Sequence, residues 1–457
     1  MGNDRVKTGD IMDHSTADKL AANTDLPWMH DRMAWFQDQK FGLFIHWGIY
    51  SVWGIRESWP LSPADQWARS DTMKPWVERD RDLARFSADY RALNGQFNPV
   101  QFDPQAWAAA AEHAGMKYVC FTTKHHDGFC MFDTRTTDYR MTHPSCPFHT
   151  NPRANVTKEV FDAFRQRGMG IWCYYSKSDW HTPSYWSPDF PVVDRNPNYD
   201  TLKDPQRWDK FVQYTHEQMR ELLSEYGKID VLWLDGGQVQ PPHQDIRMDE
   251  IAAFGRELQP QLIIADRTVG GKHENFITPE QTVPDEPLGC PWESCVTMGP
   301  GFSYGLDDVY KPVEELVHLL IDVVAKGGNL LLNVAPSPEG LFAPGAMEAL
   351  NAIGDWMQIH GQAIYGTRAI APYVEGNLRF TRKDDTVYVF VLKEAEQAVG
   401  EQTVVLRSLQ PREGETVTML GYDTPLQWVR HEDHVVVNLP SDVVLSDYAW
   451  AMKFQIA

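Results

Sequence analysis

The chain has 457 residues, too many for one small domain and enough for a barrel of about 250 to 400 residues with one accessory module. Its 42 Lys and Arg against 63 Asp and Glu give a net charge of −21, which argues against nucleic acid and anionic membranes as partners. The sequence has no apolar run long enough to span a membrane and no export signal in its first 25 residues, so we expect a cytoplasmic protein.

After a polar stretch at 1–27, which we interpret as a flexible leader, short apolar runs alternate with helical patterns. The predicted strands cover 41–45, 117–123, 170–175, 229–235, 262–265 and 329–334. The predicted helices cover 104–114, 156–167, 204–226, 249–258, 313–325 and 344–360. This alternation is typical of parallel βαβ units.

Residues 28–364 are therefore expected to form an α/β domain of the (β/α)8 type, a TIM-like barrel. Six strands are visible in the pattern, and we place the missing ones in the irregular regions around 50–100 and 270–310. An open doubly wound sheet is the alternative, but no glycine-rich phosphate-binding loop follows the first strand.

From 365 to 457 the pattern changes to short alternating runs separated by turns, which predicts a C-terminal antiparallel β-sandwich. Its strands are expected at 377–381, 386–392, 403–406, 416–420, 434–439 and 450–456. This part of the chain has no charged cluster that looks catalytic, so we expect the functional site in the barrel.

Residues 229–237, IDVLWLDGG, form an apolar run that ends in Asp235 and two glycines. This pattern indicates a buried parallel strand that opens into a loop, where barrel enzymes carry catalytic side chains. Trp233 lies two positions earlier, on the same side of the strand. Polar residues also follow other predicted strands, namely His46, His125, His126 and Arg267. Because strand ends converge on one face of a barrel, we expect these side chains to share a pocket.

Two chemistries fit these residue types. His46, His125, His126 and Asp235 are suitable ligands for a divalent metal, as in a barrel metallohydrolase. Spaced His pairs on one strand are absent, however, and the adjacent His125 and His126 point to opposite faces if their strand stays regular. We therefore favour a metal-free pocket that binds hydroxyl groups, with Asp235 as nucleophile. Polar residues that are merely satisfied under loops are the third interpretation.

Cleavage of a glycosidic bond by double displacement needs a second carboxyl group, protonated at rest and roughly 5 to 5.5 Å from the first. The candidates are Glu57, Glu274, Glu280, Glu286 and Glu293. Glu293 follows Trp292, whose ring can raise its pKa by desolvation, whereas Glu57 follows Arg56, which favours ionisation. We expect Glu293 to be the acid and Glu57 to be its rival.

Several longer motifs accompany these single residues. They are KFGLFIHWG (40–48), KHHDGF (124–129), YYSKSDW (174–180), WLDG (233–236), DR (266–267), WESC (292–295) and KGGNLLLNV (326–334). In this order, between residues 28 and 340, they resemble the α-L-fucosidases of glycoside hydrolase family 29. The combination is highly specific for that family, although no single motif is.

The resemblance implies a (β/α)8-like catalytic domain, a C-terminal β-sandwich and a retaining mechanism without cofactor or metal. Asp235 matches the family's nucleophile, and Glu293 matches its acid/base position. Further positions match residues that bind the sugar, namely His46, His125, His126, Tyr175, Trp233 and Arg267. Many members carry adjacent Glu-Trp after the first strand. Here Ser58 separates Glu57 from Trp59, and we count both as sugar-binding candidates.

The sequence thus predicts a retaining exo-α-L-fucosidase that acts on a small molecule or oligosaccharide bearing α-L-fucose; a homo-oligomer is left open. An α-L-galactosidase is the nearest alternative, because L-galactose differs from L-fucose only by a hydroxyl group on C6. A catalytically lapsed sugar-binding protein and a barrel metallohydrolase are alternatives from other classes. Both carboxyl roles have candidates in this chain, which speaks against the lapsed protein.

Overall fold

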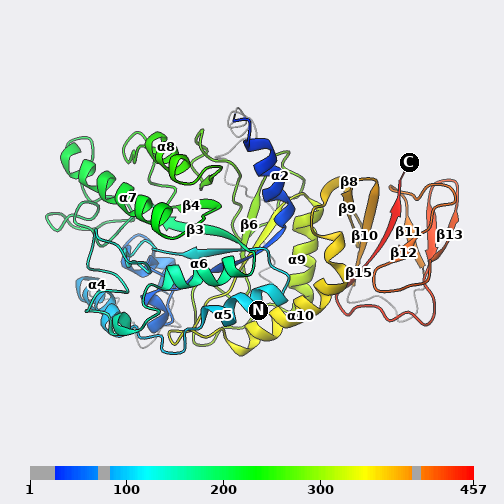
Figure 1. The fold of residues 1–457 in the computed structure, drawn as a ribbon, viewed down its shortest axis with the longest axis horizontal. Helices are drawn as coiled ribbons and strands as arrows, with labels where there is room; N and C mark the ends of the chain where they lie inside the picture. Colours follow the sequence, from blue (N-terminus) through cyan, green and yellow to red (C-terminus); the bar gives the residue numbers. More distant parts are fainter. Residues whose placement is uncertain (1–25, 70–82, 394–402, 457) are drawn as a thin grey trace.

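The computed structural model describes residues 26–69, 83–393 and 403–456, so most of the leader expected at 1–27 lies outside the described residues. Within them, seven parallel strands form one curled sheet in the order β5-β4-β3-β2-β1-β7-β6 (Figure 1). They are β1 (Phe41–Ile45), β2 (Tyr118–Thr122), β3 (Gly170–Ser176), β4 (Val231–Asp235), β5 (Ile263–Asp266), β6 (Glu293–Thr297) and β7 (Asn329–Asn333). Nearly every residue in them is buried, which explains why six of them appear in the sequence as apolar runs.

Helices lie around this sheet (Figure 1). They are α2 (Met29–Gln39), α4 (Leu83–Arg91), α5 (Pro104–His113), α6 (Val156–Gln166), α7 (Pro205–Glu225), α8 (Met248–Leu258), α9 (Val313–Ala325) and α10 (Pro344–His360). Both α5 and α7 begin with Asp-Pro: Asp103 and Asp204 each accept a hydrogen bond from a backbone N–H of the first turn, and the proline has no N–H to satisfy. None of the described helices has the length and apolar character needed to cross a bilayer.

Residues 275–281 occupy the space between the edge strands β5 and β6. The backbone N–H of Asn275 donates to the carbonyl of Ile264 in β5 at 2.8 Å, and that of Gln281 donates to the carbonyl of Cys295 in β6 at 2.9 Å. With this irregular segment as the eighth position, the sheet closes around its axis, which confirms the (β/α)8-like barrel.

The two missing barrel positions therefore both fall within 270–310, and the expectation of a strand around 50–100 is wrong for the described residues there. Those residues form short 3-10 helices and α4 instead. Residues 275–281, the closing segment of the barrel, did not show the apolar pattern of a strand, because Pro279 interrupts them and the remaining residues are mostly polar.

Beyond the barrel, the chain forms two antiparallel sheets with the orders β12-β15-β10-β9-β8 and β11-β14-β13, which confirms the predicted sandwich. The strands are β8 (Arg368–Glu375), β9 (Leu378–Lys383), β10 (Thr386–Leu392), β11 (Thr403–Leu406), β12 (Thr418–Met419), β13 (Gln427–Arg430), β14 (Val435–Asn438) and β15 (Ala449–Gln455). Their inward side chains form a separate apolar core. Strands β8 and β13 were not predicted. Both are edge strands whose residues are largely partly buried or exposed, so they lack a clear apolar alternation.

The sandwich rests on the barrel's helices α9 and α10 (Figure 1). Arg379 of β9 forms an ion pair with Asp322 of α9, and the indole N–H of Trp356 in α10 donates to the carbonyl of Ala449 at 2.7 Å. The domain boundaries at 27/28 and 364/365 stay predictions.

Candidate active site

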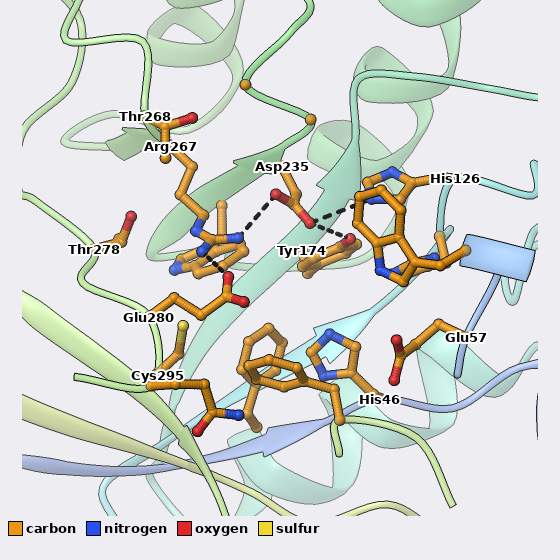
Figure 2. A pocket seen from close by; sticks show the side chains of 18 of the residues that line it. His46, Glu57, His126, Tyr174, Asp235, Arg267, Thr268, Thr278, Glu280 and Cys295 are labelled. Carbon is orange, nitrogen blue, oxygen red and sulfur yellow. Dashed lines mark hydrogen bonds and ion pairs between the residues drawn. The ribbon is translucent and has the colours of Figure 1, made fainter. Parts of the chain in front are cut away.

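A cavity of about 570 Å³ opens at the C-terminal ends of the barrel strands. It is lined by residues of the loops that follow β1 to β6 and by the closing segment (Figure 2). Eight of the ten residues expected from the sequence line it, namely His46, Glu57, Trp59, His125, His126, Trp233, Asp235 and Arg267. The structure therefore brings together side chains that are more than 200 positions apart in the sequence.

Asp235 is the last residue of β4, and three side chains converge on its carboxylate (Figure 2). Arg267 places Nη1 2.9 Å from Oδ1, the Tyr174 hydroxyl donates to Oδ2 at 2.8 Å, and Nε2 of His126 lies 3.7 Å from Oδ2. Burial alone would raise the pKa of Asp235, but the positive charge of Arg267 and the hydrogen bond from the Tyr174 hydroxyl hold it well below its ordinary value. Asp235 is therefore an ionised carboxylate, poised for nucleophilic attack.

The proton positions on two of the histidines follow from their partners. Nδ1 of His46 lies 2.7 Å from Oδ1 of Asn333, and the Asn333 amide group already donates to the carbonyl of Phe302. Oδ1 must then accept, so His46 donates through Nδ1 and keeps an unprotonated Nε2. Burial lowers the pKa of His46 to about 3, so the ring is neutral.

His126 follows the same logic. Its Nδ1 lies 2.6 Å from the hydroxyl of Ser176, whose own proton goes to the carbonyl of Ser178. His126 therefore donates through Nδ1 and leaves Nε2 unprotonated on the side of Asp235, with its pKa lowered to about 4 by burial. The neighbouring His125 also lines the cavity because β2 has already ended at Thr122, and its Nδ1 lies 2.6 Å from the Ser58 hydroxyl.

His125, His126 and Asp235 are the metal-ligand types that cluster most closely among the described residues, with candidate atoms within 4.8 Å of one another. A bound cation would nevertheless compete with Arg267, which already places a full positive charge 2.9 Å from the same carboxylate. The serine contacts of both imidazoles account for their orientation without a metal. The geometry thus favours hydroxyl binding over a metal centre.

Glu57 and Trp59 both reach the cavity, although Ser58 separates them. Glu57 is buried, and its Oε1 accepts a hydrogen bond of 2.6 Å from the backbone N–H of Ser303. Burial raises the pKa of Glu57 to about 7. The Trp59 ring packs edge-on against His126, with 4.8 Å between ring centres.

Glu293 does not reach the cavity, which contradicts its prediction as the acid. It is the first residue of β6 and therefore lies at the end of the strand away from the catalytic loops. Its side chain is fully buried, and its two oxygens accept hydrogen bonds of 3.1 Å from the indole N–H groups of Trp172 and Trp233. Burial does raise its pKa, to about 7, but the group supports Trp233 from beneath the cavity instead of facing it.

Tyr175 is likewise misplaced by the sequence prediction. Its hydroxyl donates to Gln218 of α7 at 2.7 Å, and it accepts a hydrogen bond of 2.9 Å from Lys124, so it faces the helical layer. Tyr174, and not Tyr175, lines the cavity. Residues paired across neighbouring strands share one face of the sheet, and Tyr174 pairs with the inward-facing Trp233.

Glu280 is a carboxyl group of the cavity that the sequence analysis named as a candidate but did not rank. It comes from the closing segment, lines the cavity and forms an ion pair with Nη2 of Arg267. Arg267 therefore pairs with Asp235 through Nη1 and with Glu280 through Nη2 (Figure 2). The only signal for it was its place among the acidic residues between β5 and β6.

Two carboxyl groups in one cavity at the C-terminal end of a parallel barrel are what a barrel glycoside hydrolase needs. Within that class the chain belongs to the α-L-fucosidase family, because the model of the Alpha-L-fucosidase family matches residues 12–362. A second model, Alpha-L-fucosidase C-terminal domain, matches residues 372–455.

Individual relatives agree with this assignment. The chain is 28% identical to human tissue alpha-L-fucosidase over 448 residues, which is 92% of this chain and 88% of the relative. Among solved structures, alpha-L-fucosidase isoenzyme 1 from Paenibacillus thiaminolyticus aligns with a TM-score of 0.77 and 30% identity, covering 94% of this chain and 99% of its own. Thermotoga maritima alpha-fucosidase in complex with fucose aligns with a TM-score of 0.73, 27% identity and coverages of 94% and 99%.

Proposed function

We propose that this protein is a retaining exo-α-L-fucosidase that releases terminal α-L-fucose from oligosaccharides or glycoconjugates by double displacement. The observation that carries the mechanism is the pair of carboxyl groups, Asp235 and Glu280, held on two nitrogens of one guanidinium. The family and the fucose complex of the Thermotoga maritima relative support fucose as the sugar.

In the first step, Asp235 attacks the anomeric carbon while a protonated carboxyl group gives its proton to the leaving oxygen. The products are a fucosyl ester of Asp235 and the free aglycone. In the second step the same acid, now a carboxylate, takes a proton from water, which displaces Asp235 and releases fucose with retained configuration. Arg267 orients the nucleophile, and its positive charge loses one partner when the ester forms.

We assign the acid and base role to Glu280 rather than to Glu293 or Glu57. The position of a carboxyl group matters more for this choice than its pKa, because the proton donor must reach the glycosidic oxygen beside the nucleophile. Glu280 shares the guanidinium of Arg267 with Asp235, whereas Glu57 lies on the other side of His46 from Glu280 in Figure 2. Glu57 is the second candidate, since its raised pKa of about 7 suits an acid that is protonated at rest.

The remaining cavity residues hold the sugar. The unprotonated Nε2 atoms of His46 and His126 are hydrogen-bond acceptors, so hydroxyl groups of the sugar can donate to them. Trp233 adds an aromatic surface below Asp235, fixed in place by its hydrogen bond to Glu293. Neutral acceptors that face a ring of hydroxyl groups fix its orientation without adding charge to the site.

The first test compares 4-nitrophenyl glycosides of α-L-fucose and α-L-galactose, each with and without EDTA. We expect release of 4-nitrophenol from the fucoside, a weaker reaction with the galactoside, and no effect of EDTA in either case. Preference for the galactoside would favour the α-L-galactosidase, and loss of activity with EDTA would favour a metallohydrolase. No turnover of any fucoside would favour the lapsed sugar-binding protein.

Tyr174→Phe removes the hydroxyl that donates to Oδ2 of Asp235, and we expect kcat/KM to fall by about tenfold or more, the usual effect of losing a hydrogen bond to a charged group. Tyr175→Phe is the matched control. It removes a hydroxyl that contacts Lys124 and Gln218, so it should lower the melting temperature and leave kcat/KM nearly unchanged. Steady-state kinetics and thermal unfolding of both variants check the assignment, and a larger kinetic effect of Tyr175→Phe would contradict it.

A further inference from the structure

The cavity continues outward past the residues assigned to the fucose ring. The Trp59 ring lies 4.8 Å from His126, and the Trp67 ring lies 5.7 Å beyond that of Trp59. His126 in turn lies 3.7 Å from Asp235. Trp67 is therefore connected to the nucleophile through Trp59 and His126. This outer part of the cavity is available to the leaving group of a bound fucoside.

Trp67 is unusual for an aromatic residue because it is 60% exposed. It lies on a short 3-10 helix, η4 (Gln66–Ala68), and lines the cavity. Because this exposed indole lines the cavity, it offers a large apolar surface that a ligand bound there can cover. Flat aromatic surfaces of this kind suit the apolar faces of sugar rings.

The orientation of Trp67 is set by a buried carboxylate, Asp65. Its Oδ1 accepts a hydrogen bond of 3.1 Å from the indole N–H, and the same atom forms an ion pair with Arg195. Asp65 is only 3% exposed, so its carboxylate is held in place by the surrounding protein and is not a solvated surface group. With its only polar hydrogen engaged, Trp67 offers an apolar surface to the cavity.

Arg195, in the loop between β3 and α7, contacts both Asp65 and Trp59. Its guanidinium lies 4.6 Å from the centre of the Trp59 ring, and it also lines the cavity. Asp65 balances its positive charge, so the group carries no net charge toward a ligand. The guanidinium N–H groups that Asp65 does not use are donors for hydroxyl oxygens.

We propose that Trp67 and Arg195 form the binding site for the sugar that precedes fucose, a leaving-group subsite that selects an uncharged pyranose. The apolar face of that ring stacks on Trp67, and its hydroxyl groups accept hydrogen bonds from Arg195. This inference rests on the proposed fucosidase function and adds the class of its natural substrate, a fucosylated oligosaccharide with a neutral hexose next to the fucose.

The test compares two substrates on the full-length protein and its Trp67→Ala variant. One is a fucosylated disaccharide with a neutral hexose. The other is α-L-fucosyl fluoride, whose leaving group is a single atom and cannot reach Trp67. We expect the ratio of kcat/KM for the disaccharide to kcat/KM for the fluoride to fall about threefold to tenfold, the range of one aromatic contact, mainly through a higher KM for the disaccharide. Trp67→Phe, which keeps an aromatic ring, should recover most of this ratio.

Phe190→Ala is the matched control, because Phe190 is a similarly exposed aromatic residue, at 48%, that does not line the cavity. An unchanged ratio in Trp67→Ala, or the same change in Phe190→Ala, overturns the leaving-group subsite. The wild-type reaction with fucosyl fluoride tests the fucosidase function separately. Its complete absence overturns that function, and the subsite with it.

Discussion

Replacing Asp235 by asparagine is expected to lower kcat by about 10³-fold or more while the protein keeps its fold, because the variant loses the attacking carboxylate. Arg267 keeps its contact with Glu280 in this variant, so the buried guanidinium is not left without a polar partner. Asp249→Asn, at an exposed aspartate outside the cavity, is the matched control. Kinetics with 4-nitrophenyl α-L-fucoside and circular dichroism measure both effects, and near wild-type turnover of Asp235→Asn would refute the role.

Asp235→Gly adds a positive signal to this loss. The shortened side chain leaves space beside the anomeric carbon, where added azide can attack directly and expel the leaving group. A single displacement inverts the configuration, so we expect partial recovery of activity and β-L-fucosyl azide as the product. Nuclear magnetic resonance of the product distinguishes this outcome. A metal-dependent mechanism does not predict azide rescue at this residue.

Glu280→Gln should give the second largest effect, one that depends on the leaving group. We expect a loss of about 10² to 10⁴-fold for a fucosylated disaccharide, whose leaving oxygen needs a proton, and a much smaller effect on the first step with fucosyl fluoride. The second step also loses its base, so a fucosyl ester should accumulate on Asp235. Azide attacks that ester without a base, and the product should be α-L-fucosyl azide, of the opposite configuration to that from Asp235→Gly.

Glu57→Gln is the comparison that decides between the two carboxyl groups. If Glu57 only binds the sugar, its loss should affect both substrates to a similar degree, and azide should have no effect. Azide rescue with retained configuration in Glu57→Gln, and not in Glu280→Gln, would transfer the acid and base role to Glu57. The raised pKa of Glu57, about 7, would then belong to the catalytic acid and would help to keep it protonated before the first step.

The sequence predicted the features that depend on burial and strand direction. Asp235 was found because a continuous apolar run ended there, and parallel strands in a closed barrel expose their C-terminal ends. The same rule placed His46 and Arg267 correctly, as each directly follows a strand. His125 and His126 share the cavity because β2 stops before them, so strand alternation does not apply.

The errors have equally physical causes. Tyr174 and Tyr175 are both buried aromatic residues in β3, so composition cannot tell which faces the cavity; the register against β4 does. Glu293 was misjudged because the sequence does not reveal that β6 begins at this residue, which places it below the cavity. Glu280 was not ranked because its segment replaces a regular strand and depends on hydrogen bonds to β6.

The central claim is that Asp235 attacks the anomeric carbon of an α-L-fucoside. Its most direct test is incubation with 2-deoxy-2-fluoro-α-L-fucosyl fluoride, followed by mass spectrometry of the intact protein and its peptides. The fluorine at C2 slows both steps, whereas the fluoride leaving group speeds only the first, so the covalent intermediate accumulates. We predict one added fluorofucosyl group, located on the peptide that contains Asp235 and absent in Asp235→Asn. A label on another residue, or turnover of fucoside without any covalent label, would contradict the mechanism.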